Sequence, residues 1–297
     1  MNTPTRVAAE SAHARLRQHT TAWFLATGVT TGVVGALGAV RTGFGATWLG
    51  WSAIALIVLA VEYRLVVVRL PANHRPGAKG PSPKLGAANL LTLLRGVLIA
   101  WTAGFLAFGA GWLSTAGWFP AVGSVSVFGG MDPSPLSFDG YLVWLPAVCY
   151  GVAALLDAGD GALARHRGRI TALGAQLDTE YDALGVLVAT IVGVFGGAIP
   201  AWYLSVGFAR YAFVGGVRLR RLRGRPVYEL PERTPARLLA GAQMVFLAAA
   251  LSPILGTDAV AVGSVVVGVP FLLGFLRDWL HVSGRHSGLD QSKRNDH

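Results

Sequence analysis

Four aspartates stand close together in a chain that otherwise carries little charge. Asp157, Asp160, Asp178 and Asp182 lie within residues 157–182, and apolar segments flank them on both sides. Carboxylates that are crowded and partly buried stay ionised only when cations neutralise them. Oxygen ligands of this kind suit Mg²⁺, Mn²⁺ or Ca²⁺, and water and substrate phosphate usually complete a Mg²⁺ site. The aspartates therefore predict a site for divalent cations, and two pairs are enough for two ions.

The spacing of the aspartates predicts that they face one shared space. Asp157 and Asp160 are three residues apart and Asp178 and Asp182 are four apart, so each pair lies on one helix face. The segment between the pairs is basic, which is typical of a turn at the cytoplasmic surface of a membrane. Two antiparallel helices joined by this turn would present all four carboxylates to each other.

Small residues and one arginine share these helix faces. Gly161, Ala164 and Arg165 follow the first pair at helical spacing, and Gly174 precedes Asp178 by about one turn. A missing side chain lets a ligand approach the backbone closely, and a guanidinium binds phosphate oxygens. The pattern favours a phosphate-bearing ligand over structural ion pairs with other arginines, because buried ion pairs add little stability.

The composition indicates that the helices carrying these residues lie in lipid. Of the 297 residues 53% are hydrophobic and 13% are charged, and the mean hydropathy is +0.51. A soluble domain carries about 25% charged residues, and a membrane-spanning helix needs about 20 mostly apolar residues. Eight segments are predicted to span: 22–40, 46–68, 88–112, 141–163, 172–197, 200–220, 236–253 and 259–280.

The distribution of the basic residues predicts how these spans are oriented. The net charge is +10, and every Lys and Arg except Arg41 lies on the cytoplasmic side if the N-terminus is cytoplasmic and all eight segments span. The positive-inside rule then places both termini and the aspartates at the cytoplasmic face of the cell membrane. The basic loops can contact anionic lipid headgroups. Nucleic acid is therefore not expected as a partner.

The predicted fold is an all-α polytopic membrane protein with three regions. Residues 1–85 contain a tail, a transmembrane hairpin and a basic linker rich in Pro and Gly. Residues 86–282 contain six helices, with a predicted outside loop at 113–140 that has no Lys or Arg. Residues 283–297 form a polar tail that is predicted to be disordered.

The acidic stretch resembles the signature of the CDP-alcohol phosphatidyltransferases. A second element, NLLTLLR from Asn89 to Arg95, resembles the Asn-x-x-Thr-x-x-Arg element on the first core helix of that family. The resemblance covers residues 86–282 as a six-helix CDP-alcohol phosphotransferase core and leaves the N-terminal two-helix hairpin outside it. The signature reads Asp157-x-x-Asp160-Gly161-x-x-Ala164-Arg165, eight residues, Gly174-x-x-x-Asp178-x-x-x-Asp182.

The resemblance implies a metal-dependent transferase of phospholipid biosynthesis. Such an enzyme moves a phosphatidyl-type group from a CDP-linked lipid to a polar alcohol and releases CMP. It implies two Mg²⁺ ions, with Mn²⁺ as an alternative, and Asp182 as the general base. The implied metal ligands are Asp157, Asp160, Asp178 and Asp182, and the implied CDP-binding residues are Asn89, Leu90, Leu91, Thr92, Gly161, Arg165 and Thr171.

Basic residues near the aspartates suggest the kind of acceptor. Arg95, Arg210 and Arg277 lie near the cytoplasmic ends of core spans and are candidates to bind a phosphorylated polyol, although Arg277 fits lipid headgroups better. The family resemblance then points toward a phosphatidylglycerophosphate or phosphatidylinositol-phosphate synthase-like activity and a homodimer. Glu180 lies on a different helix face from the aspartates and is expected to pair with an arginine.

A cation transporter or channel is the alternative function. Ionisable residues inside a membrane often mark an ion pathway. A pathway would place acids near the middle of the bilayer, whereas these two pairs flank a cytoplasmic turn and include a Gly, Ala and Arg pattern. The sequence therefore favours the transferase.

Overall fold

The computed structural model describes most of the chain as α-helix. The described residues form eight α-helices and no strand. The predicted outside loop, most of the basic linker and nearly all of the C-terminal tail lie outside the described residues. The structure describes residues 3–73, 85–109, 142–167, 171–230 and 234–284, without the side chains of 3–10, 12–13, 87–88, 160–167 and 234–237.

Each of the eight predicted spans overlaps one of these helices. The first helix begins well before its predicted span, because the Ala- and Arg-rich segment that precedes the span favours helix. The helices are α1 (Thr3–Thr42), α2 (Gly45–Arg69), α3 (Ala87–Gly104), α4 (Leu145–Arg167), α5 (Ala172–Phe195), α6 (Leu204–Leu222), α7 (Thr234–Ala250) and α8 (Thr257–Val282).

Four apolar stretches in the described part of the chain are long enough to cross a membrane. They lie on α1, on α3, on α4 and on α8, and a shorter apolar stretch lies on α7. Such helices are what a multi-pass membrane protein requires. The membrane-length stretches are Ala14–Thr42, Asn89–Phe108, Leu142–Gly159 and Thr257–Val282.

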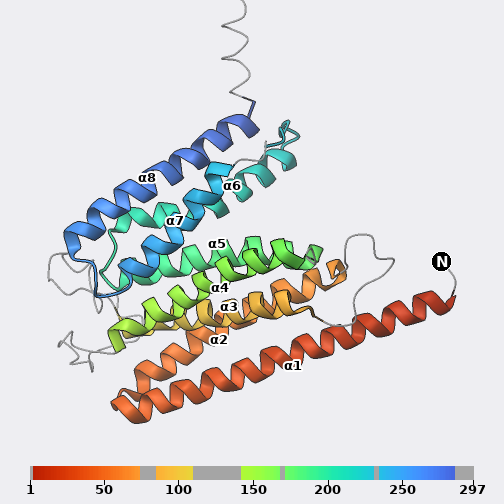
Figure 1. Ribbon diagram of the computed structural model, residues 1–297, viewed down its shortest axis with the longest axis horizontal. Helices are drawn as coiled ribbons and strands as arrows, with labels where there is room; N and C mark the ends of the chain where they lie inside the picture. The colour runs from red at the N-terminus through yellow and green to blue at the C-terminus, as the bar shows by residue number, and fades with distance from the viewer. Residues whose placement is uncertain (1–2, 74–84, 110–141, 168–170, 231–233, 285–297) are drawn as a thin grey trace, which may run out of the picture.

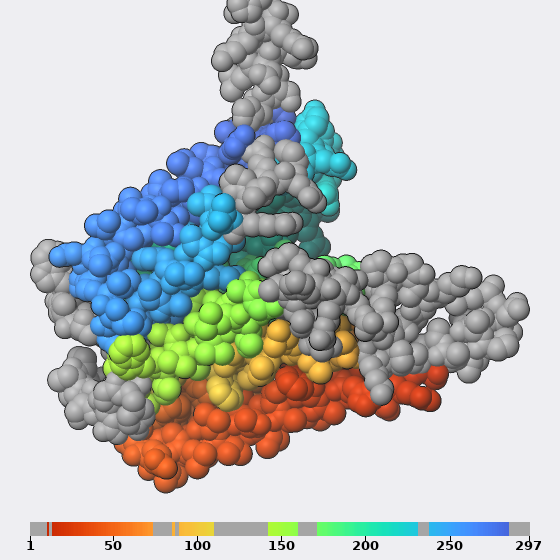
Figure 2. Space-filling model, in the orientation of Figure 1, coloured from red at the N-terminus to blue at the C-terminus, as the bar shows by residue number. Residues whose placement is uncertain are grey.

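The helices pack in an order that places α3, α4 and α5 together at the centre. Helix α3 contacts α2, α4 and α5, while α6 packs on α5, α7 packs on α4, and α8 packs on α6 and α7. Figure 1 shows the hairpin α1–α2 on one side of this centre and α6–α8 on the other. Figure 2 shows α1 and α8 along opposite edges of the molecule. The aspartates are therefore carried by the central helices.

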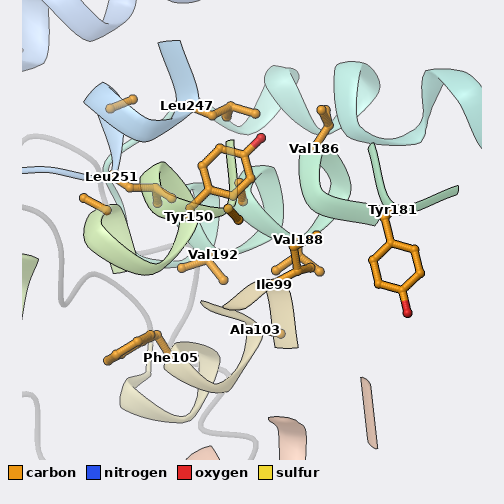
Figure 3. Close-up of a cluster of buried hydrophobic side chains, with 14 of the residues drawn as sticks. Ile99, Ala103, Phe105, Tyr150, Tyr181, Val186, Val188, Val192, Leu247 and Leu251 are labelled. Atoms are coloured by element: carbon orange, nitrogen blue, oxygen red, sulfur yellow. The ribbon is translucent and has the colours of Figure 1, made fainter. Parts of the chain in front are cut away.

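A buried apolar cluster holds the central helices against each other. Ile99 of α3, Tyr150 of α4, Val192 of α5 and Leu247 of α7 are all buried in it (Figure 3). Buried apolar side chains of this size each contribute about 1.5–3 kcal/mol to folding in water, and close packing takes over that role in lipid. Large apolar side chains that face outward, such as Leu25 and Val262, suit contact with lipid tails.

The N-terminal hairpin packs directly on α3. Indole Nε1 of Trp101 on α3 donates a hydrogen bond to Thr31 Oγ1 on α1, with 2.9 Å between the atoms. At Gly104 of α3, a Cβ atom would lie only 2.6 Å from the indole ring of Trp51 on α2. The absence of a side chain at Gly104 thus lets the start of α2 lie close to the end of α3.

Candidate active site

Two adjacent helices bring three of the predicted metal ligands together. Asp157 lies on α4, and Asp178 and Asp182 lie one turn apart on α5. One carboxylate oxygen from each residue lies within 4.8 Å of the others, and all three side chains are partly exposed. Asp160 follows Asp157 on α4, but its side chain lies outside the described residues.

Arg95 of α3 lies among these three carboxylates. Its Nη1 donates to Asp157 Oδ1 and, at 3.0 Å, to Asp178 Oδ1. Its Nη2 donates to Asp182 Oδ1 at 2.8 Å and to the backbone oxygen of Asp178 at 3.1 Å. Arg95 is only 3% exposed, so its charge is buried beside these carboxylates.

This position of Arg95 was not predicted from the sequence, which suggested that Arg95 binds the acceptor. The signal was present in the element from Asn89 to Arg95, whose polar residues recur every three positions and so follow one face of α3. What the sequence lacked was the packing of α3 against α4 and α5, which turns this face toward the aspartates.

The charges of the cluster fit a divalent cation. Three carboxyl groups face a single guanidinium, so a further cation at the site would favour their ionised form. Arg95 hydrogen-bonds the Oδ1 atom of each aspartate, and a carboxylate has lone pairs on both oxygens. Carboxylate oxygens gathered in this way are the ligands that hard cations such as Mg²⁺ prefer.

Two of the predicted CDP-binding residues meet at the start of α5. Thr171 is the N-cap of α5, and its Oγ1 accepts from Gly174 N at 3.0 Å. The same hydroxyl donates to Asn89 Oδ1 on α3 at 3.2 Å. Both side chains are buried, and Asn89 is only 2% exposed. The hydrogen bond therefore fixes the start of α5 against the start of α3.

Gly174 has a different role from the one expected from its place in the motif. We expected its missing side chain to make room for a ligand. A Cβ atom at Gly174 would instead lie 2.8 Å from Asn89 Oδ1 and 3.3 Å from Thr171 Oγ1. The glycine thus makes room for the Asn89 amide, which fills the space beside α5.

The other predicted nucleotide residues are only partly described. Thr92 is buried on α3 and Leu91 is half-buried, whereas Leu90 is 40% exposed. Gly161 and Arg165 belong to α4, but their side chains lie outside the described residues. The described nucleotide residues therefore come from two helices that meet beside the carboxylate cluster.

Two further charged residues lie near the cluster. Glu180 of α5 pairs with Arg69 of α2 at 2.9 Å, which confirms that it pairs with an arginine. Arg210 of α6 acts electrostatically on Asp182. Arg277 of α8 makes no ion pair to any residue that the structure describes. Of the candidate acceptor residues outside α3, Arg210 thus lies nearer the site.

These features define a helical membrane protein with an acidic centre suited to cations and phosphate. Residues 85–275 match the family model for CDP-alcohol phosphatidyltransferase, and this match spans more than half of the chain. The chain therefore belongs to the CDP-alcohol phosphatidyltransferase family, the membrane transferases of phospholipid biosynthesis. The matched residues begin just before α3 and end within α8, so they include the whole carboxylate cluster. No curated protein and no solved structure matches the chain.

Proposed function

We propose that this enzyme transfers a phosphatidyl-type group from a CDP-linked lipid to a polar alcohol and releases CMP. The observation that carries the proposal is the cluster of Asp157, Asp178 and Asp182, whose oxygens lie within 4.8 Å beside the buried Asn89–Thr171 pair. An acidic centre next to hydrogen-bonding side chains suits a diphosphate that is attached to a nucleotide. The catalytic core is residues 86–282, to which the hairpin (1–85) and the tail (283–297) are additions.

Asp157, Asp160, Asp178 and Asp182 would hold two Mg²⁺ ions, with Mn²⁺ as the alternative. The donor set supports this assignment, because carboxylate oxygens from two helices converge on one point. When bound, the ions neutralise charge on the transferred phosphate and on the departing CMP. The chain's own residues then have to hold the donor, orient the acceptor and take up its proton.

Asp182 would act as the general base. Its carboxylate is partly exposed and is held by Arg95, so it is oriented but still reachable by an acceptor hydroxyl. The acceptor oxygen attacks the β-phosphorus and a new oxygen–phosphorus bond forms. The bond from that phosphorus to the oxygen of CMP breaks, and the hydroxyl proton passes to Asp182.

The nucleotide of the donor would lie between α3 and the adjoining ends of α4 and α5. The residues assigned to it are Asn89, Leu90, Leu91, Thr92, Gly161, Arg165 and Thr171. Support comes from the hydrogen bond between Asn89 and Thr171, which joins two of these residues from helices far apart in sequence. The lipid part of the donor can then remain among the outward-facing apolar side chains.

A phosphorylated polyol is the proposed acceptor, as in a phosphatidylglycerophosphate or phosphatidylinositol-phosphate synthase. Support comes from Arg210, a cation that acts on Asp182 from α6 and can bind an acceptor phosphate. We further propose that the core has six membrane spans and the hairpin two, and that the protein is a homodimer. Both termini and the site would lie on the cytoplasmic face of the cell membrane. The basic cytoplasmic loops support this orientation.

The position of Arg95 argues against the alternative of a cation channel or transporter. A guanidinium that donates to three carboxylates at once lies between them, where a permeating cation would have to pass. A transferase needs these carboxylates held still, and Arg95 does that.

The test is release of CMP by the purified protein in mixed micelles of CDP-diacylglycerol with Mg²⁺. A panel of acceptors should contain glycerol 3-phosphate, inositol phosphate, serine and inositol. We expect CMP with a phosphorylated polyol, and loss of at least about a hundredfold in rate in Asp178→Ala and Asp182→Ala. Unchanged turnover in these variants, or no CMP with any acceptor, would contradict the proposal. Metal flux through liposomes without CMP release would establish the alternative.

A further inference from the structure

The end of the N-terminal hairpin reaches the proposed nucleotide pocket. Helix α2 ends at Arg69 and continues as a short 3₁₀ helix, η1 (Leu70–Ala72), which is followed by Asn73. Leu70 and Asn73 are both 0% exposed. Neither belongs to residues 85–275, which match the family model. This buried turn is therefore an addition to the family core, placed against its site.

Asn73 extends the hydrogen-bonded chain that holds the pocket residues. Its Oδ1 accepts from Asn89 Nδ2 at 3.2 Å. Asn89 Oδ1 accepts in turn from Thr171 Oγ1, and Thr171 Oγ1 accepts from Gly174 N at the start of α5. A single chain of hydrogen bonds thus runs from the hairpin through α3 to α5.

This chain of hydrogen bonds determines which way the Asn89 amide points. An amide side chain has a donor end and an acceptor end, and rotation by half a turn exchanges them. Asn73 offers an acceptor to the Nδ2 end, so the Oδ1 end faces the Thr171 hydroxyl. Without the oxygen of Asn73, the buried Nδ2 group of Asn89 would lose this hydrogen-bond partner. The orientation of the Asn89 amide would then be less strongly fixed.

A second contact holds the turn in place. Arg69, four residues before Asn73, pairs with Glu180 on α5 at 2.9 Å. Glu180 lies between the two aspartates of α5 in sequence. The hairpin therefore contacts α5 through Glu180 and α3 through Asn89, and these are two of the three helices that carry the proposed site.

We propose that Asn73 is a positioning residue for donor binding, through which the hairpin orders Asn89 and Thr171 for the nucleotide. This inference rests on the proposed function, which assigns those two residues to the CDP group. Asn73 contacts neither substrate. Its effect is to fix the amide orientation and the distance between α3 and α5 before the donor arrives.

The test compares steady-state constants for Asn73→Ala, Asn73→Ser and Asn73→Asp with those of the unchanged protein. Alanine has no side-chain acceptor, and the serine hydroxyl is one bond too short to take the place of the Asn73 amide oxygen, whereas aspartate carries an oxygen at that place. We expect about a five- to twentyfold rise in KM for CDP-diacylglycerol with alanine and serine. The acceptor KM and kcat should stay within about twofold, because nothing that meets the acceptor has changed. Aspartate should restore most of the donor affinity.

Tyr63→Phe is the matched control. It removes a hydrogen bond of 3.0 Å between Tyr63 and Thr21 inside the hairpin, away from the site, and keeps the aromatic ring. We expect unchanged constants. If this variant raises the donor KM as much as Asn73→Ala does, the hairpin acts only through general stability and the proposal is wrong.

A double-mutant cycle shows whether Asn73 acts through Asn89. In an Asn89→Ala background, Asn73→Ala should raise the donor KM no further. Additive effects of the two substitutions would overturn the inference, as would an unchanged donor KM in both Asn73→Ala and Asn73→Ser. These results leave the proposed function standing. Absence of CMP release by the unchanged protein would overturn the proposed function, and this inference with it.

Discussion

Arg95 on α3 donates a hydrogen bond to Asp182 on α5, with 2.8 Å between Nη2 and Oδ1. The same guanidinium donates to Asp157 on α4, so one buried side chain joins the three central helices. A guanidinium carries several donors in one rigid plane, which suits it to orient more than one carboxylate. Arg95 thus positions the carboxylates of the site and offsets part of their charge.

Arg95→Gln should lower both stability and turnover. Removing one partner of a buried ionic cluster leaves uncompensated carboxylates, and we expect a loss of about 3 kcal/mol in the free energy of unfolding. CMP release should fall at least about tenfold, since the carboxylates lose the group that orients them. Unfolding in detergent and CMP release measure the two effects. Arg64→Gln, at an exposed position of α2, should alter neither stability nor CMP release. Equal effects of the two substitutions would contradict the positioning role of Arg95.

Removal of divalent cations should abolish transfer, and Mg²⁺ should restore it. The physical reason is the excess of carboxylates over cations at the cluster of Asp157, Asp178 and Asp182. Binding of Mn²⁺ in the absence of substrate, followed by electron paramagnetic resonance, should weaken by at least about tenfold in Asp178→Asn, which removes a charge from the site. Asp258→Asn, at an exposed position on α8, should bind Mn²⁺ normally. Full CMP release after chelation would refute the prediction.

Gly174→Ala should weaken binding of the donor. The new methyl group would lie 2.8 Å from Asn89 Oδ1, so the amide or the start of α5 has to move. We expect a loss of about 1–3 kcal/mol in stability and a higher KM for CDP-diacylglycerol. A Cβ atom at Gly241 of α7 would meet no atom of the described residues within 4 Å, so Gly241→Ala should instead stabilise its helix by up to about 1 kcal/mol. Opposite signs for the two variants in thermal unfolding are the expected result.

Glu62→Met should stabilise the protein. Glu62 of α2 is 0% exposed, and neither of its carboxylate oxygens has a hydrogen-bond partner among the described residues. It lies against α3, since a Cβ atom at Gly96 would be 2.6 Å from its Oε2. A buried polar group without a partner costs about 1–3 kcal/mol, which an apolar chain of similar length avoids. Thermal unfolding in detergent measures the gain, and a clear loss would mean that the carboxylate has an unrecognised partner.

Much of the site followed from short-range patterns in the sequence. Apolar runs of membrane length predicted the helices, and each of the eight predicted segments overlaps one helix. Aspartates at helical spacing on either side of a basic turn predicted that Asp157, Asp160, Asp178 and Asp182 would meet. The structure places oxygens of Asp157, Asp178 and Asp182 together, and the side chain of Asp160 lies outside the described residues. Such features are local, because residues three or four apart share a helix face whatever surrounds the helix.

The contacts between distant helices could not be predicted in the same way. The insertion of Arg95 among the aspartates depends on the depth and rotation at which α3 packs against α4 and α5. The packing of the Asn89 amide against Gly174 and the hydrogen bond between Asn89 and Asn73 likewise depend on how helices far apart in the chain fit together. The sequence by itself determined the helices, the faces of the aspartates and the family. Tertiary structure alone decided which side chains orient them, because interhelical packing sums many weak contacts that no local pattern records.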